Sequence, residues 1–110
     1  MQGKILAENG AMTTNATEPV QHREHGGRGE FYIEREGKRI AELTYSSNAG
    51  AIVVGHTWVD PQLRGGRLAP NLVEAAVRWA RAEGRKIIPV CSYVRAVFNR
   101  MGQYADVWER

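Results

Sequence analysis

The stretch that decides the fold runs from Ala51 to Glu83 and reads AIVVGHTWVDPQLRGGRLAPNLVEAAVRWARAE. Its first part, 51–59, is mostly apolar, which is typical of a buried strand. After a short loop with a glycine pair, apolar residues recur at every fourth position, and this spacing predicts an amphipathic helix over 67–83. Gly84 then has the place of a glycine that ends a helix. We therefore expect a strand that enters a helix through a glycine-rich turn.

Two further segments complete the expected fold. Residues 31–45 alternate apolar and polar side chains on both sides of Glu36-Gly37, which predicts a β-hairpin leading into the buried strand. After the helix, 86–90 predicts a short apolar strand and 92–101 a second helix. A strand–helix–strand unit crosses over with a right hand and pairs its strands in parallel. The expected fold class is α/β (α+β), with a mixed sheet, an antiparallel meander followed by a parallel strand–helix–strand unit, and about two main helices.

The N-terminal residues differ from the rest of the chain in composition. Residues 1–21 have little apolar periodicity and are expected to be a flexible leader or an expression scar before a single domain over 22–110. His22–Gly29, HREHGGRG, is polar and glycine-rich and is expected to be a loop. His22 and His25 are not expected to hold a metal, because no third ligand is in view.

Composition excludes several classes of protein. The chain has 110 residues, one cysteine and a formal net charge of +3. A single cysteine excludes an internal disulfide framework and a four-cysteine zinc site. No apolar run approaches the roughly 20 residues that cross a bilayer, so no membrane partner is expected. The reduced thiol and the lack of a targeting signal favour a cytoplasmic location.

The glycine-rich turn predicts an anion site. Free backbone N–H groups at the start of a helix bind phosphates, and the mild positive charge suits a phosphorylated cofactor or a nucleic-acid backbone. Gly65 and Gly66 allow close approach to a phosphate, while Arg64 and Arg67 add positive charge. The alternative is an ordinary tight turn, because glycine-rich turns are common.

Three segments in this order carry a resemblance to a known family: HTWV at 56–59, LRGGRLA at 63–69 and IIPVCSYV at 87–94. Their spacing resembles the small single-domain N-acetyltransferases of the GNAT superfamily, over about 31–108. The resemblance implies a GNAT-like fold and acetyl-CoA as cofactor. It also implies that the acetyl group passes to a primary amine, either a protein or peptide lysine or a small amine.

The resemblance also implies a set of cofactor-binding residues. The family's loop pattern is Arg/Gln-x-x-Gly-x-Gly/Ala; Arg64 matches its first position and Ala69 its last, whereas Arg67 stands where the pattern has its first glycine. Pro70 directly after the pattern is unusual, because the residue before a proline avoids the helical region. The expected cofactor-binding residues are Trp58, Val59, Arg64, Gly65, Gly66, Arg67, Leu68, Ala69 and Ser92.

Cys91, His56 and Tyr93 are the predicted catalytic residues. Cys91 lies between a strand and a helix, where the helix dipole and free amides stabilise a thiolate. Two mechanisms stay open: an acetyl group carried on Cys91, or direct transfer with Cys91 only lining the pocket. His56 is a candidate base for the incoming ammonium, and Tyr93 a candidate acid for the leaving thiolate. Asn99 stands where many larger GNAT enzymes place a tyrosine acid.

Two other functions remain as alternatives. A non-catalytic acyl-CoA-binding or regulatory module on the same fold is favoured by Arg67 in the loop and by the missing tyrosine acid. A small basic nucleic-acid adaptor is disfavoured, because such a surface normally needs more charge and exposed aromatic residues. The sequence does not indicate an oligomeric state.

Overall fold

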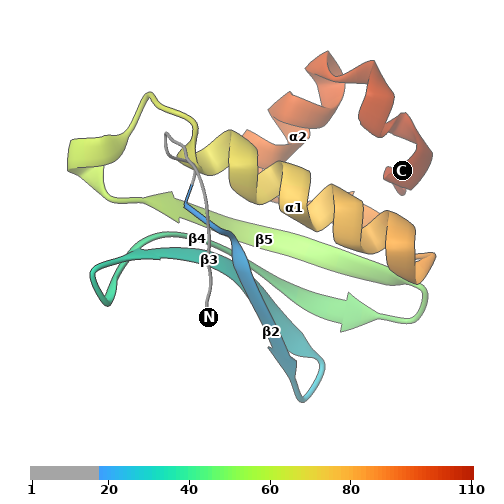
Figure 1. The fold of residues 1–110 in the computed structure, drawn as a ribbon. Coiled ribbons are helices and arrows are strands. Elements are labelled where there is room, and N and C mark those ends of the chain that lie inside the picture. The colour runs from blue at the N-terminus through green and yellow to red at the C-terminus, as the bar shows by residue number, and fades with distance from the viewer. Residues whose placement is uncertain (1–17) are drawn as a thin grey trace.

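A five-stranded sheet with one long helix across it dominates the computed structural model, which describes residues 18–110 (Figure 1). Most of the expected leader, residues 1–17, therefore lies outside the described residues. The elements are β2 (Gln21–His25), β3 (Arg28–Arg35), β4 (Lys38–Asn48), β5 (Ala51–Val59), a 3-10 turn η2 (Pro61–Leu63), α1 (Leu68–Glu83), β6 (Lys86–Pro89), α2 (Ser92–Arg100) and a 3-10 segment η3 (Gly102–Val107).

The sheet has the mixed topology that the sequence predicts. Its strands follow chain order, β2-β3-β4-β5-β6; the first four are antiparallel and β6 is parallel to β5. The expected strands and the two expected helices are present, and α1 ends at Gly84 in the left-handed conformation, with a φ of 68°. The C-terminal segment adds a short 3-10 segment after α2.

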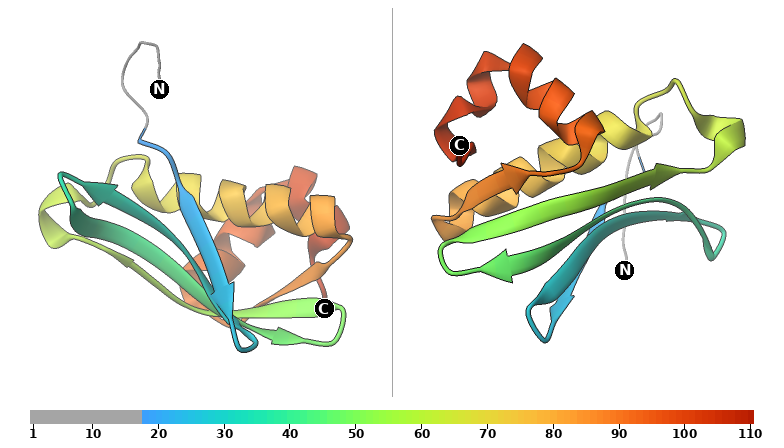
Figure 2. Two further views of the ribbon diagram at one scale, coloured as in Figure 1. Left: turned by 60° about the horizontal axis from the view of Figure 1, so that its bottom comes forward. Right: turned by 180° about the vertical axis from the view of Figure 1, so that it is seen from behind.

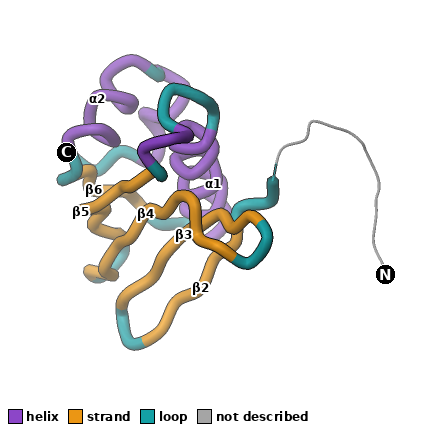
Figure 3. Tube along the Cα trace, turned by 90° about the vertical axis from the view of Figure 1, so that its left-hand side faces the viewer, coloured by secondary structure: helices purple, strands orange, loops and turns teal. Residues whose placement is uncertain are grey.

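The helices lie on one side of the strands (Figures 1 and 3). The apolar face of α1 packs against β3, β4 and β5, and α2 lies beside β6 and η3. The buried side chains of α1 are Leu72, Val73, Ala76, Val77 and Ala80. No element within residues 18–110 covers the opposite face of the sheet (Figure 2). We call this uncovered side the open face.

One expectation about the N-terminal part is wrong. The polar stretch His22–Gly29 is not a loop but a hairpin, in which β2 pairs with the start of β3 around a turn at Gly26-Gly27. The strand escapes sequence detection because it is a sheet edge with almost no buried side chain. His22 anchors it: the imidazole stacks on Phe31 at 4.1 Å between centroids, and its Nε2 lies 2.7 Å from the hydroxyl of Tyr45.

A β-bulge at Gly55 changes the register of β5 against β4. Tyr45 pairs with Val54 but Thr44 pairs with His56, so Gly55 has no partner. Successive side chains of a strand point to opposite faces, and one extra residue exchanges the faces of all that follow. Val54 and Thr57 therefore both face the helices, while His56 lies on the open face.

The pairing of β5 with β6 stops early. The two strands are in register only over Ala51–Val54 and Lys86–Pro89, and the amides of Val90 and Cys91 both donate to the carbonyl of Val54, at 3.0 and 2.9 Å. Beyond this point β5 continues to Val59, whereas the segment after β6 turns away and enters α2. The two strands therefore separate at Pro89, which has no N–H to donate to a ladder.

Candidate active site

A cavity of about 290 Å³ lies at the separated end of β5. Its wall combines the last residues of β5, the glycine-rich loop, the first turn of α1 and one side chain of α2. All the predicted cofactor-binding residues except Arg67 and Ser92 line it, together with the predicted acid Tyr93 and with Leu63 and Thr57, which the sequence analysis did not single out. The structure thus joins segments far apart in the sequence into one site.

The loop presents backbone donors to this cavity. Gly65 has a φ of 90°, in the left-handed region that favours glycine, and a Cβ built there would meet no atom within 4 Å. The residue before α1 gives no side-chain cap, so the first-turn amides keep their N–H groups for a ligand. Pro70 is accommodated in this same turn, where an N–H would have no intrahelical partner. These donors fit the pyrophosphate of coenzyme A.

The two loop arginines have different places. The Nε of Arg64 donates to the carbonyl of Val59 at 2.9 Å, which ties the loop to the end of β5. Arg67 precedes the first residue of α1, and its Nη2 lies 3.5 Å from Oδ1 of Asn71, one helical turn further on. Its side chain therefore lies along the helix and leaves the cavity to the glycines.

Cys91 lies beside the cavity, at the N-terminus of α2. Its half-buried Sγ is 3.3 Å from Oγ1 of Thr57. Burial alone would raise the pKa of the thiol, but the Thr57 hydroxyl and the backbone amides of Val94, Tyr93 and Thr57 outweigh it and hold the pKa below its ordinary value. The site thus stabilises the thiolate, the nucleophilic form of cysteine.

Tyr93 presents a protonated hydroxyl to the same cavity. Burial raises the pKa of this phenol above its ordinary value, although Arg100 and Arg67 act in the opposite direction. A phenol with a raised pKa stays protonated at neutral pH and is available as a proton donor. The predicted acid Tyr93 and the glycine-rich loop thus line one cavity, and the predicted nucleophile Cys91 lies beside it.

Comparison with known proteins shows the family of this chain. Residues 30–107 match the family model described as GCN5-related N-acetyl-transferase. The chain belongs to this family. Its acetyltransferase class and the expected cofactor, acetyl-CoA, are thereby confirmed. A comparison with curated protein sequences finds no significant match.

Solved structures agree with this assignment. A GCN5-like predicted N-acetyltransferase from Staphylococcus aureus is 30% identical, with a TM-score of 0.63 over 81% of this chain and 87% of that one. A ribosomal-protein-alanine N-acetyltransferase from Brucella melitensis is 15% identical, with a TM-score of 0.57 over 67% and 62%. An aminoglycoside N-acetyltransferase in complex with CoA is 19% identical, with a TM-score of 0.52 over 78% and 71%. The last two show the fold alone.

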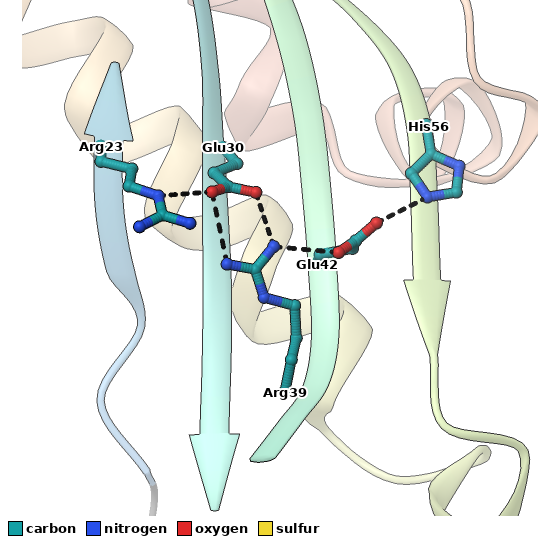
Figure 4. A network of polar contacts seen from close by, with 5 residues as sticks. All are labelled: Arg23, Glu30, Arg39, Glu42 and His56. Carbon is teal, nitrogen blue, oxygen red and sulfur yellow. Dashed lines mark hydrogen bonds and ion pairs between the residues drawn. The ribbon is translucent and has the colours of Figure 1, made fainter. Parts of the chain in front are cut away.

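His56 of this GCN5-related acetyltransferase is not in the cavity. Its side chain lies on the open face, where Nε2 is 3.0 Å from Oε2 of Glu42 (Figure 4). An ionised carboxylate only accepts hydrogen bonds, so Nε2 carries the hydrogen and Nδ1 is left to accept a proton. Arg39 bridges Glu42 to Glu30, at 3.0 and 2.6 Å, and Arg23 completes the row at 2.6 Å from Glu30.

Two residues that contact the predicted catalytic side chains, Thr57 beside Cys91 and Glu42 beside His56, were not predicted from the sequence. Thr57 faces Cys91 only because the bulge reverses the side on which the later side chains of β5 lie. In the sequence, Gly55 itself is the only local indication of the bulge. Glu42 occupies a polar position in an alternating strand, where a carboxylate is ordinary.

No group of three or more metal-ligating side chains occurs among residues 18–110, and no helix there is long and apolar enough to cross a membrane.

Proposed function

We propose that this GCN5-related acetyltransferase moves the acetyl group to a primary amine through a thioester on Cys91. The observation that carries the proposal is the surroundings of the Cys91 sulfur: one hydroxyl 3.3 Å away and three backbone amides that lower the pKa of the thiol. A merely structural cysteine needs none of these donors, because buried thiols are ordinarily protonated and inert.

The donor would bind with its pyrophosphate on the glycine-rich loop and the uncapped start of α1. When bound, acetyl-CoA supplies an activated acetyl thioester. The separated end of β5 leaves room for the pantetheine arm between the loop and Cys91. In this arrangement Arg64 keeps the loop in place, while Gly65 and Gly66 let the phosphates approach the backbone.

The first half of the proposed reaction uses Cys91 and Tyr93. The Cys91 thiolate attacks the thioester carbonyl, a new S–C bond forms, and the bond to the departing sulfur breaks. The Tyr93 hydroxyl gives its proton to that sulfur, which leaves as a thiol, and the phenolate takes up a proton from solvent before the next turnover. The amides of Thr57, Tyr93 and Val94 stabilise the cysteine sulfur whenever it carries negative charge.

The second half returns Cys91 to its starting state. A neutral amine attacks the acetyl carbonyl, the C–N bond forms, and the Cys91 sulfur leaves as a thiolate on the same donors. Nδ1 of His56 takes the proton that the amine loses, and the Glu42 carboxylate stabilises the imidazolium that results. The acceptor class at this stage is a primary amine, on a protein or peptide lysine or on a small molecule.

Intact-mass measurement after mixing with acetyl-CoA tests the proposal. Because the chain has one cysteine, an increment of one acetyl group that hydroxylamine removes reports Cys91 alone. We expect the increment in the native chain, its loss in Cys91→Ala, and its discharge by an added amine. Acetyl transfer by Cys91→Ala at the native rate would refute the thioester and leave direct transfer.

The thiolate environment has a matched pair of variants. Thr57→Val removes the hydroxyl at nearly constant shape, whereas Thr57→Ser keeps it. The pH midpoint of iodoacetamide alkylation should move upward in Thr57→Val, because the thiolate loses a donor, and stay near the native value in Thr57→Ser. Identical midpoints in all three proteins would show that Thr57 does not activate Cys91.

A further inference from the structure

A second, larger hollow lies on the open face, across β2, β3, β4 and β5. Its volume is about 670 Å³, and its lining includes Arg28, Glu30, Thr44, Val53, Gly55 and His56. We call it the open-face groove. None of the predicted cofactor-binding residues lines it. The groove and the cavity beside Cys91 are therefore distinct, with β5 between them.

The groove approaches Cys91 at Gly55. The backbone of Val54 and the side chain of Thr57 both contact Cys91, and these residues bracket Gly55 and His56. Gly55 carries no side chain, is exposed, and a Cβ built there would meet no atom within 4 Å. The pairing of β6 with β5 ends at Val54, so Gly55 has no strand partner on that side and lies between two residues that contact Cys91.

The charges of the groove are arranged along its length. At the Gly55 end stands His56, whose Nε2 is held by Glu42, and the Glu42 carboxylate also pairs with Arg39 at 3.0 Å. Further along, the charge of Glu30 is already matched by Arg39 and Arg23, at 2.6 Å each. Arg28 has no ion pair among residues 18–110. The groove therefore offers an unmatched positive charge away from the amine end.

The register sets the separation of these two ends. Arg28, Ser46 and Val53 are partners in one row across β3, β4 and β5, and Glu30, Thr44 and His56 form another. Two strand spacings and two residues of rise place Arg28 about 12 Å from His56, measured between backbone positions. An extended peptide covers this distance in about three or four residues.

We propose that the open-face groove binds an extended peptide that presents an acceptor lysine at Gly55 and an acidic side chain, four residues away and on the same face of the peptide, to Arg28. This inference rests on the function proposed above and names its acceptor. The open face favours a peptide over a small amine, because small ligands are ordinarily enclosed over most of their surface and nothing within residues 18–110 encloses this face. The lysine Nζ forms the C–N bond, the Cys91 sulfur leaves, and Nδ1 of His56 takes the proton.

Two peptides and two charge reversals test the groove. One fluorescein-labelled peptide carries a lysine with an aspartate four residues away, on the same face of the extended chain, and its partner has asparagine at that place. Arg28→Glu should raise the KM and the Kd for the acidic peptide about fivefold, the effect of one exposed ion pair. The matched control is Lys38→Glu, an exposed cation at the start of β4 outside the groove, which should leave both constants unchanged.

Fluorescence anisotropy measures binding without turnover, and this separates the two proposals. Binding of the acidic peptide that depends on Arg28, without acetyl transfer, would retain the groove and overturn the proposed function. Acetyl transfer with equal KM for both peptides, or equal effects of Arg28→Glu and Lys38→Glu, would overturn the groove alone. Gly55→Leu supplies an independent check, because it fills the amine end and should abolish transfer to the peptide; native transfer by this variant would also overturn the groove.

Discussion

Gly29 is the glycine of β3 on which the aromatic cluster depends, and Gly29→Ala should be strongly destabilising. A Cβ at this position would lie 2.3 Å from both Cζ and Oη of Tyr45. The ring has to move, and its hydrogen bond with His22, 2.7 Å long, is then lost. Overpacking costs about 1–3 kcal/mol and the hydrogen bond about 1 kcal/mol, so the free energy of unfolding should fall by about 2–4 kcal/mol.

Thermal unfolding followed by circular dichroism measures this loss. A change of 1 kcal/mol moves the Tm of a domain of this size by about 4–8 °C, so we expect a drop of at least about 8 °C. The fluorescence of Trp79 should change as well, because its ring centroid lies 5.6 Å from that of Tyr45.

The matched control is Gly55→Ala, which also adds a Cβ to a strand glycine but places it in open space. Its effect should stay within about 0.5 kcal/mol. A Tm of Gly29→Ala within about 2 °C of the native value would refute the reasoning, because Tyr45 then would not lie over Gly29.

Two further predictions concern pH and the loop. Burial lowers the pKa of His22 in the folded protein. Below about pH 6.5 the unfolded chain therefore binds a proton at this histidine that the folded protein does not yet bind. The free energy of unfolding falls as the pH drops from there toward the lower pKa of the folded state. Unfolding melts at about pH 7.5 and 5.5 should show this fall in the native chain and in His25→Gln, an exposed substitution on the same strand, but not in His22→Phe. Gly65→Ala forces a side chain into the left-handed region at a cost of about 1–2 kcal/mol. It should weaken acetyl-CoA binding in calorimetry, whereas Gly102→Ala, which does not line the cavity and adds a Cβ in open space, should not. Native affinity in Gly65→Ala would contradict the proposed phosphate site.

Much of the candidate site follows from local patterns. The spacing of four from Leu68 to Ala80 and the glycine at 84 determine the helix, and the glycine-rich turn before it determines where free amides gather. These features depend on neighbours within a few residues, so the sequence predicts them without knowledge of the rest of the chain. The edge strand β2 cannot be predicted in this way, because the residue that anchors it, His22, packs among aromatic rings of distant elements.

The sequence by itself therefore determined the order of the elements from β3 to α2, the glycine-rich loop before α1 and the place of Cys91 at a strand-to-helix junction. Only the tertiary structure decided which residue of β5 meets that cysteine. Simple alternation from the buried Ile52 and Val54 would put His56 on the helix side. The bulge at Gly55 instead turns Thr57 toward the thiol and His56 toward the open face. The choice lies in the register of β5 against β4, and register is set by pairing between strands and not by either strand alone.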